Sequence, residues 1–289
     1  MRSISAWTKR HSVLAYYVLT FIISWGGILI VVGGPAGIPG APDQFLTMLP
    51  LLLVAMLLGP TVAGLLMTAL TDGSAGLRQL QTRVGRWRVP GRWWAVALLT
   101  APLVMIVIPV AVSIFFPQYL PGIFAAADKP SLLAMGIGAG ISVLFEEIGW
   151  TGFAIPRLRL RHSLLSTGLI VGFPWAAWHL LVNFWSSGTT SGTLALPALL
   201  SSLIFSWGIL PAFRVLMVWV YEHTESVLVA WLMHATLTAG NVILAPLAMT
   251  GITAPTWSLI IAVALWILVA YVVRSRQLEP SRQAQARAA

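Results

Sequence analysis

Long uncharged apolar runs recur along the whole chain, and they constrain its fold more than any other feature. Of the 289 residues, 58% are hydrophobic and only 9% are charged, and the mean hydropathy is +0.88. Soluble domains carry about 25% charged residues, so this is the composition of a multi-pass membrane protein. The lack of cysteine excludes a disulfide scaffold, thiolate-ligated metals and a cysteine nucleophile.

Eight of these runs are long enough to cross a bilayer, which takes about 20 residues. We therefore expect an all-α integral membrane protein with a single multi-pass domain over residues 1–275 and a disordered tail over 276–289. The sequence shows no internal repeat of the kind that characterises inverted-repeat transporters. The predicted spans are 13–34, 47–71, 93–116, 131–153, 164–184, 195–220, 226–247 and 257–273.

Basic residues fall on every second linker between the spans, whereas the other linkers carry almost no charge. The positive-inside rule then predicts that both termini are cytoplasmic in a cell membrane. The formal charge of +9 is thus a topology signal, and we expect membrane lipids rather than nucleic acid as partners. The basic regions are the N-terminus, 72–92, 157–161, a boundary with Arg214, Glu222, His223 and Glu225, and the tail.

Four ionisable residues lie inside predicted spans. Glu146 and Glu147 are neighbours in the stretch LFEEIGW (144–150), and His179 and His234 follow in later spans. An ionised group at the bilayer centre costs about 3 kcal/mol on insertion scales, so such groups face the protein interior and usually mark function. We expect a cavity on the cytoplasmic side, lined by the fourth, fifth and seventh helices.

The residue types predict hydrolytic chemistry. Two adjacent carboxyl groups in a low dielectric resist double ionisation, so they are expected to share a proton. A glutamate near a histidine suits general-base activation of water, and a second histidine can donate to an oxyanion. Glu146, His179 and His234 would also make a zinc set with an open water position. Because their spacing is not that of an HExxH motif, metal-free glutamate catalysis is favoured over zinc.

Three stretches together resemble one known family. They are EEIGWTGFAIPRLR (146–159), FPWAAWH (173–179) and RVLMVWVYEHTESVLVAWLMHATLT (214–238). The resemblance is to the CPBP family, which contains the CAAX prenyl endoproteases and the bacteriocin-immunity-type proteins of the ABI group. Its signature is Glu-Glu-x-x-x-Arg, then aromatic-x-x-x-His, then His-x-x-x-Asn, and the similarity covers about residues 140–245. It implies a glutamate-type intramembrane endopeptidase, with prenylated CAAX carboxyl termini among the family's substrates.

The resemblance also implies roles for the four ionisable residues. Glu146 corresponds to the catalytic glutamate and Glu147 to its paired neighbour. His179 corresponds to the histidine that helps to activate water, and His234 to the one that binds the oxyanion.

Two motif positions differ from the family pattern. Thr151 stands where the first motif has arginine, and Thr238 stands where the third has asparagine. Asn241 shares a helix face with His234, and Asn183 shares one with His179, so both are supporting candidates. Arg157 would replace the missing guanidinium only if the chain bends back.

Three functions follow from these observations. The first is an endopeptidase that cuts a peptide or protein substrate, lipidated or not, near the cytoplasmic membrane face. The second is a catalytically degenerate family member that acts as an immunity or scaffold protein, which the two threonines favour. The third and weaker one is a proton-coupled transporter with a Glu/His relay.

Overall fold

The computed structural model of the chain describes residues 10–247 and 250–288. Within these residues the regular structure is helical, and no strand occurs beyond an isolated antiparallel bridge between Gly188 and Leu194. Eight helical segments in this part are long and apolar enough to cross a membrane, which confirms the predicted all-α multi-pass fold. They are Ser12–Val31, Thr47–Val84, Gly91–Ser113, Lys129–Leu158, Leu164–Ser186, Leu196–Thr224, Val227–Leu244 and Thr253–Arg276. The cytoplasmic placement of the termini stays a prediction.

Several of these segments are interrupted and consist of more than one helix. The helices are α2 (Ser12–Val31), α3 (Phe45–Val84), α4 (Gly91–Ser113), α5 (Gly122–Ala125), α6 (Lys129–Ser142), α7 (Leu144–Gly149), α8 (Ile155–Leu158), α9 (Leu164–Trp178), α10 (Leu180–Ser186), α11 (Leu196–Ile204), α12 (Leu210–Thr224), α13 (Val227–Leu244) and α14 (Thr253–Ala288). Two five-residue π-helical turns, η4 (Trp150–Ala154) and η5 (Phe205–Ile209), join α7 to α8 and α11 to α12.

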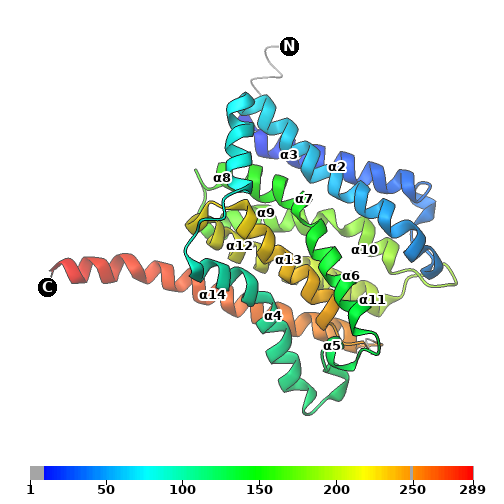
Figure 1. The fold of residues 1–289 in the computed structure, drawn as a ribbon. Helices are drawn as coiled ribbons and strands as arrows, with labels where there is room; N and C mark the ends of the chain where they lie inside the picture. The colour runs from blue at the N-terminus through cyan, green and yellow to red at the C-terminus, as the bar shows by residue number, and fades with distance from the viewer. Residues whose placement is uncertain (1–9, 248–249, 289) are drawn as a thin grey trace.

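The helix α12 forms the centre of the bundle. It packs against α9, α13, α14 and α4, while α2 and α3 lie side by side along one edge (Figure 1). Twelve of its fifteen residues are buried, as expected for a helix that is apolar on all sides. By contrast, Ile22, Ile30 and Ile267 on the outer helices are 64%, 82% and 64% exposed. These outward apolar side chains suit contact with lipid.

Two helices extend further than the sequence predicts. The helix α3 kinks at Gly73, whose φ of 63° and ψ of −155° favour glycine, and it resumes beyond the kink to Val84, through part of the predicted 72–92 linker. The helix α14 continues to Ala288 through the tail that the sequence predicts to be disordered (Figure 1). That tail is rich in alanine, glutamine and arginine, which have high helix propensity. The single-domain division stays a prediction.

The fourth span packs against α13 through glycines of α6. A Cβ added to Gly140 would lie 2.9 Å from the carbonyl oxygen of Ala235, and one added to Gly136 would meet the Ile243 side chain. Gly138, between them in sequence, has nothing within 4 Å of such a Cβ. The glycines at 136 and 140 therefore allow the two helix backbones to approach closely.

We expect Gly140→Ala to destabilise the protein by about 1–3 kcal/mol, because the backbone oxygen of α13 cannot move aside as a flexible side chain would. Gly138→Ala is the matched control, and it is expected to be neutral or to stabilise by up to about 1 kcal/mol through helix propensity. Thermal unfolding of the purified variants in detergent measures both. Equal melting temperatures for the two variants would contradict this packing.

Candidate active site

The two glutamates lie where the fourth span is broken. The helix α6 ends at Ser142, the chain turns at Val143 (φ −69°, ψ −5°), and α7 then carries both carboxyl groups. The π-helical turn η4 follows directly, and such turns occur often at functional sites. Glu146 is 5% exposed and Glu147 is fully buried. Because adjacent residues project in different directions from a helix, the two carboxyl groups have different partners.

Glu147 is fully engaged by neighbouring side chains. Its Oε1 accepts hydrogen bonds from His234 Nδ1 at 2.8 Å and from Arg214 Nη2 at 3.0 Å. Its Oε2 accepts from Arg214 Nη1 at 2.8 Å and from the Thr151 hydroxyl. A two-pronged guanidinium–carboxylate pair of this kind is strong and geometrically specific. Glu147 is therefore a structural centre that joins α7, α12 and α13.

Arg214 is a site residue that the sequence does not identify. The sequence predicts that it lies at a span boundary, but it is fully buried in α12, with its guanidinium 3.9 Å from the centre of the Trp175 ring. Its Nη1 also lies 3.4 Å from the Thr151 hydroxyl. A guanidinium from another helix thus reaches the position at which the family motif has arginine. The signal in the sequence was a lone arginine inside the apolar run 195–220.

Arg157 does not fill that position. Its guanidinium donates to the Phe153 carbonyl at 2.9 Å and to the Thr71 hydroxyl at 2.9 Å, and it pairs with Asp72. All of these partners lie away from the glutamates, near the end of the span. The chain does not bend back to bring Arg157 to Thr151.

Glu146 has a different environment from its neighbour. Its Oε2 accepts one hydrogen bond, from Trp175 Nε1 at 2.8 Å. No cation pairs with it among the described residues. It lines a cavity of about 220 Å³ between the second, fourth, fifth, sixth and seventh spans. Glu146 is therefore the carboxyl group of the pair that a bound molecule can reach.

Both intramembrane histidines line the same cavity, and each is fixed through its Nδ1. His179 lies at the break between α9 and α10, and its Nδ1 is 2.8 Å from the Trp175 carbonyl oxygen. Because a carbonyl only accepts, Nδ1 must donate there, which leaves Nε2 as the other functional nitrogen. His234, 3% exposed on α13, is held in the same manner by Glu147. The Trp175 ring contacts both histidines, with its centroid 6.0 Å from that of the His179 ring and 4.8 Å from that of the His234 ring.

The supporting candidates divide into two groups. Thr238 and Asn241 line the cavity with Glu146 and the histidines. Asn183 and Thr151 do not line it. Asn183 donates to Ser206 Oγ at 2.8 Å and so ties α10 to η5, and Thr151 binds the Glu147 carboxylate.

Zinc is the alternative cofactor that the sequence suggests for this cavity. Within the described residues, no three His, Asp or Glu side chains form a group that could hold a metal ion. The Nδ1 atoms of both histidines are hydrogen-bonded to oxygen atoms of the protein. This hydrogen bonding leaves the Nε2 atoms for other partners, as it also does in histidines that ligate zinc, so zinc binding by Glu146, His179 and His234 stays a prediction.

Comparisons with known proteins match the region that contains this site. Residues 128–240 match the family model described as type II CAAX prenyl endopeptidase Rce1-like. The CAAX prenyl protease 2 of Methanococcus maripaludis is 31% identical over 90 residues. That alignment covers 31% of this chain and 31% of the relative, so the similarity spans about a third of the relative's length. Over residues 128–240 the chain is therefore similar to the family that the three motifs indicate.

Proposed function

We propose that this chain is an intramembrane endopeptidase that uses glutamate-activated water, and the match of residues 128–240 to the Rce1-like model of type II CAAX prenyl endopeptidases supports this proposal. It hydrolyses a peptide bond of a peptide or protein substrate near the membrane face that the basic linkers mark as cytoplasmic. The observation that carries the proposal is the unequal environment of the two glutamates. Glu147 is neutralised by Arg214, while Glu146 faces a cavity with two histidines.

In the proposed reaction Glu146 takes a proton from a water molecule as the water attacks the scissile carbonyl carbon. The Nε2 of His179 accepts the other hydrogen of that water and so orients it, because Nδ1 is occupied by the Trp175 carbonyl. Glu146 then returns its proton to the leaving amine, which completes the hydrolysis. General-base catalysis of this kind contributes about 10²- to 10⁴-fold in rate.

His234 is proposed to hold the oxyanion that forms on the carbonyl oxygen. Its Nδ1 is fixed by Glu147, so the Nε2 of a protonated ring is directed into the cavity. The Glu147 carboxylate accepts a hydrogen bond from Nδ1 and so orients the ring, much as the buried aspartate of a serine-protease triad does. Thr238 and Asn241 line the same cavity and are proposed as further hydrogen-bond donors to the oxyanion or the substrate backbone.

The experiment is a cleavage assay with the purified full chain in liposomes. Two peptides of identical sequence ending in a CAAX motif are supplied, one prenylated on its cysteine and one not, and products are identified by mass spectrometry. Cleavage of either peptide supports the endopeptidase, and preference for the prenylated one identifies lipidation as part of recognition. If neither peptide is cut while the protein remains folded, the catalytically degenerate scaffold becomes the better account.

The proposed chemistry needs no metal, so chelator should leave the cleavage rate within about twofold of the untreated value. We expect this because Glu146 can act as the general base and His234 can bind the oxyanion without a metal ion. The rate is measured in the same liposomes before and after incubation with EDTA and 1,10-phenanthroline. A loss of activity that added zinc restores would contradict the metal-free mechanism.

A further inference from the structure

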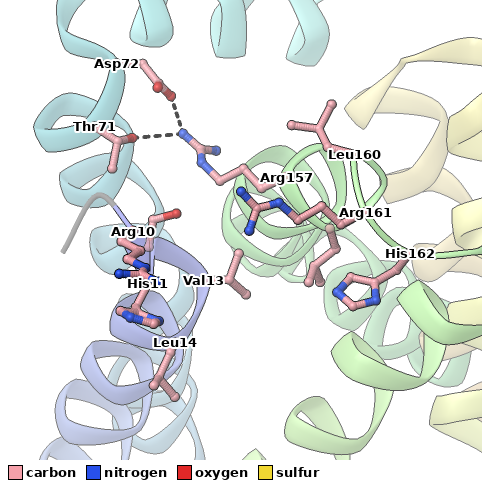
Figure 2. Close-up of a pocket in the computed structure, with 12 residues that line it drawn as sticks. Arg10, His11, Val13, Leu14, Thr71, Asp72, Arg157, Leu160, Arg161 and His162 are labelled. Carbon is pink, nitrogen blue, oxygen red and sulfur yellow. Dashed lines mark hydrogen bonds and ion pairs between the residues drawn. The ribbon is translucent and has the colours of Figure 1, made fainter. Parts of the chain in front are cut away.

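A second and larger cavity opens at the end of the bundle that carries the basic linkers. Its volume is about 570 Å³. The start of α2, the middle of α3, and α8 with the residues that follow it contribute its walls (Figure 2). It shares no lining residue with the cavity of Glu146.

Cationic side chains dominate this cavity. Arg10, Arg157 and Arg161 line it with a single carboxylate, that of Asp72. Asp72 is paired with Arg157, which the Thr71 hydroxyl also holds at 2.9 Å (Figure 2). Arg10 and Arg161 have no acidic partner among the described residues. Residues 1–9, which precede the described part, contain no aspartate or glutamate either.

The same cavity has an apolar side. Val13 and Leu14 from α2 and Leu160 from the segment after α8 line it together with the arginines. Leu14 is 52% exposed and Leu160 is 82% exposed. In a membrane-spanning chain, exposed leucines next to unpaired guanidinium groups suit a molecule that has both an anionic head and a hydrocarbon tail. A soluble anion would leave these leucines without a partner.

We propose that this cavity binds the phosphate of an anionic phospholipid headgroup from the adjacent leaflet. Arg10 and Arg161 contact the phosphate, since guanidinium groups match phosphate oxygens with paired hydrogen bonds. Arg157, held by Asp72 and Thr71, forms the fixed wall of the site (Figure 2). The lipid's acyl chains lie along Leu14 and Leu160. This site is separate from the proposed peptidase site and does not depend on it.

The test is native mass spectrometry of the detergent-purified full chain titrated with dioleoyl phosphatidylglycerol, with dioleoyl phosphatidylcholine as the zwitterionic comparison. The first bound lipid is expected to be phosphatidylglycerol. In Arg10→Gln/Arg161→Gln its affinity should fall about 25-fold, about fivefold for each lost cation near the membrane surface. The matched control Arg78→Gln/Arg88→Gln removes two exposed arginines outside the cavity and should leave the affinity unchanged. Arg10→Lys/Arg161→Lys keeps both charges and should restore most of the binding.

Three results would overturn the proposal. The first is equal affinity for the two lipids, and the second is an equal loss in both glutamine double variants. The third comes from a competition arm, in which inorganic phosphate is added at millimolar concentration. Complete displacement of phosphatidylglycerol by inorganic phosphate would assign the site to a soluble phosphate instead of a lipid.

Discussion

Replacing Glu146 by glutamine is expected to lower the rate of peptide cleavage by about 10²- to 10⁴-fold, because an amide cannot take a proton from water. The same change should alter the free energy of unfolding by less than about 1 kcal/mol. Glutamine has nearly the same shape, and its amide oxygen can still accept the Trp175 N–H that now binds Glu146. Cleavage rates in liposomes and thermal unfolding in detergent, both on one preparation, measure the two effects.

Glu225→Gln is the matched control for Glu146→Gln. Glu225 is an exposed glutamate at the basic end of the bundle, paired with Arg86 at 3.0 Å. Exposed ion pairs contribute about 0–1 kcal/mol, so this variant should keep both cleavage and stability. Cleavage by Glu146→Gln at the rate of Glu225→Gln would remove Glu146 from the chemistry.

Replacing Arg214 by methionine is expected to destabilise the protein by about 3–5 kcal/mol. The change leaves the buried Glu147 carboxylate without its cation, and an uncompensated buried charge is costly. Arg214→Lys should recover only part of the loss, because an ammonium group cannot reproduce the two-pronged geometry. Chemical or thermal unfolding in detergent provides the free energies.

Two further variants separate charge burial from a general effect of losing an arginine. Arg157→Met removes a partly exposed arginine that pairs with Asp72, and we expect a loss of at most about 1 kcal/mol. The double variant Arg214→Met/Glu147→Leu removes both buried charges and should be more stable than Arg214→Met alone. If Arg214→Met were as stable as Arg157→Met, Glu147 would not depend on Arg214.

The eight spans could be predicted from the sequence because the physical requirement is simple. A bilayer needs about 20 apolar residues for each helix, and the chain supplies them in runs separated by polar linkers. The internal breaks could not be predicted in the same manner. A π-helical turn such as Trp150–Ala154 or Phe205–Ile209 depends on packing against neighbouring helices, which local composition does not encode.

The four ionisable residues of the predicted site were found because charge inside an apolar run is rare. Three of them, Glu146, His179 and His234, line one cavity. Their individual roles could not be assigned from the sequence, since adjacent glutamates look alike there. The difference between them comes from Arg214, 67 residues further along the chain, which binds Glu147.

The burial of Arg214 could not be predicted from the sequence, because other charged residues follow it closely. Within the predicted 195–220 span it precedes Glu222, His223 and Glu225, and this charged group was interpreted as the cytoplasmic boundary of the helix. The boundary lies later, since α12 continues to Thr224 and Arg214 is in its buried part. Arg214 therefore forms the buried ion pair with Glu147 and does not mark the membrane boundary.

The proposed role of Glu146 is best measured by the rate at which proteoliposomes of the full chain release a new carboxyl terminus from a prenylated CAAX peptide. Mass spectrometry follows the product over time, with Glu146→Gln proteoliposomes at equal folded concentration as the blank. A single cut product is expected to accumulate with the wild-type protein and to form about 10²- to 10⁴-fold more slowly with the variant. Product formation at equal rates by the two proteins would contradict this role.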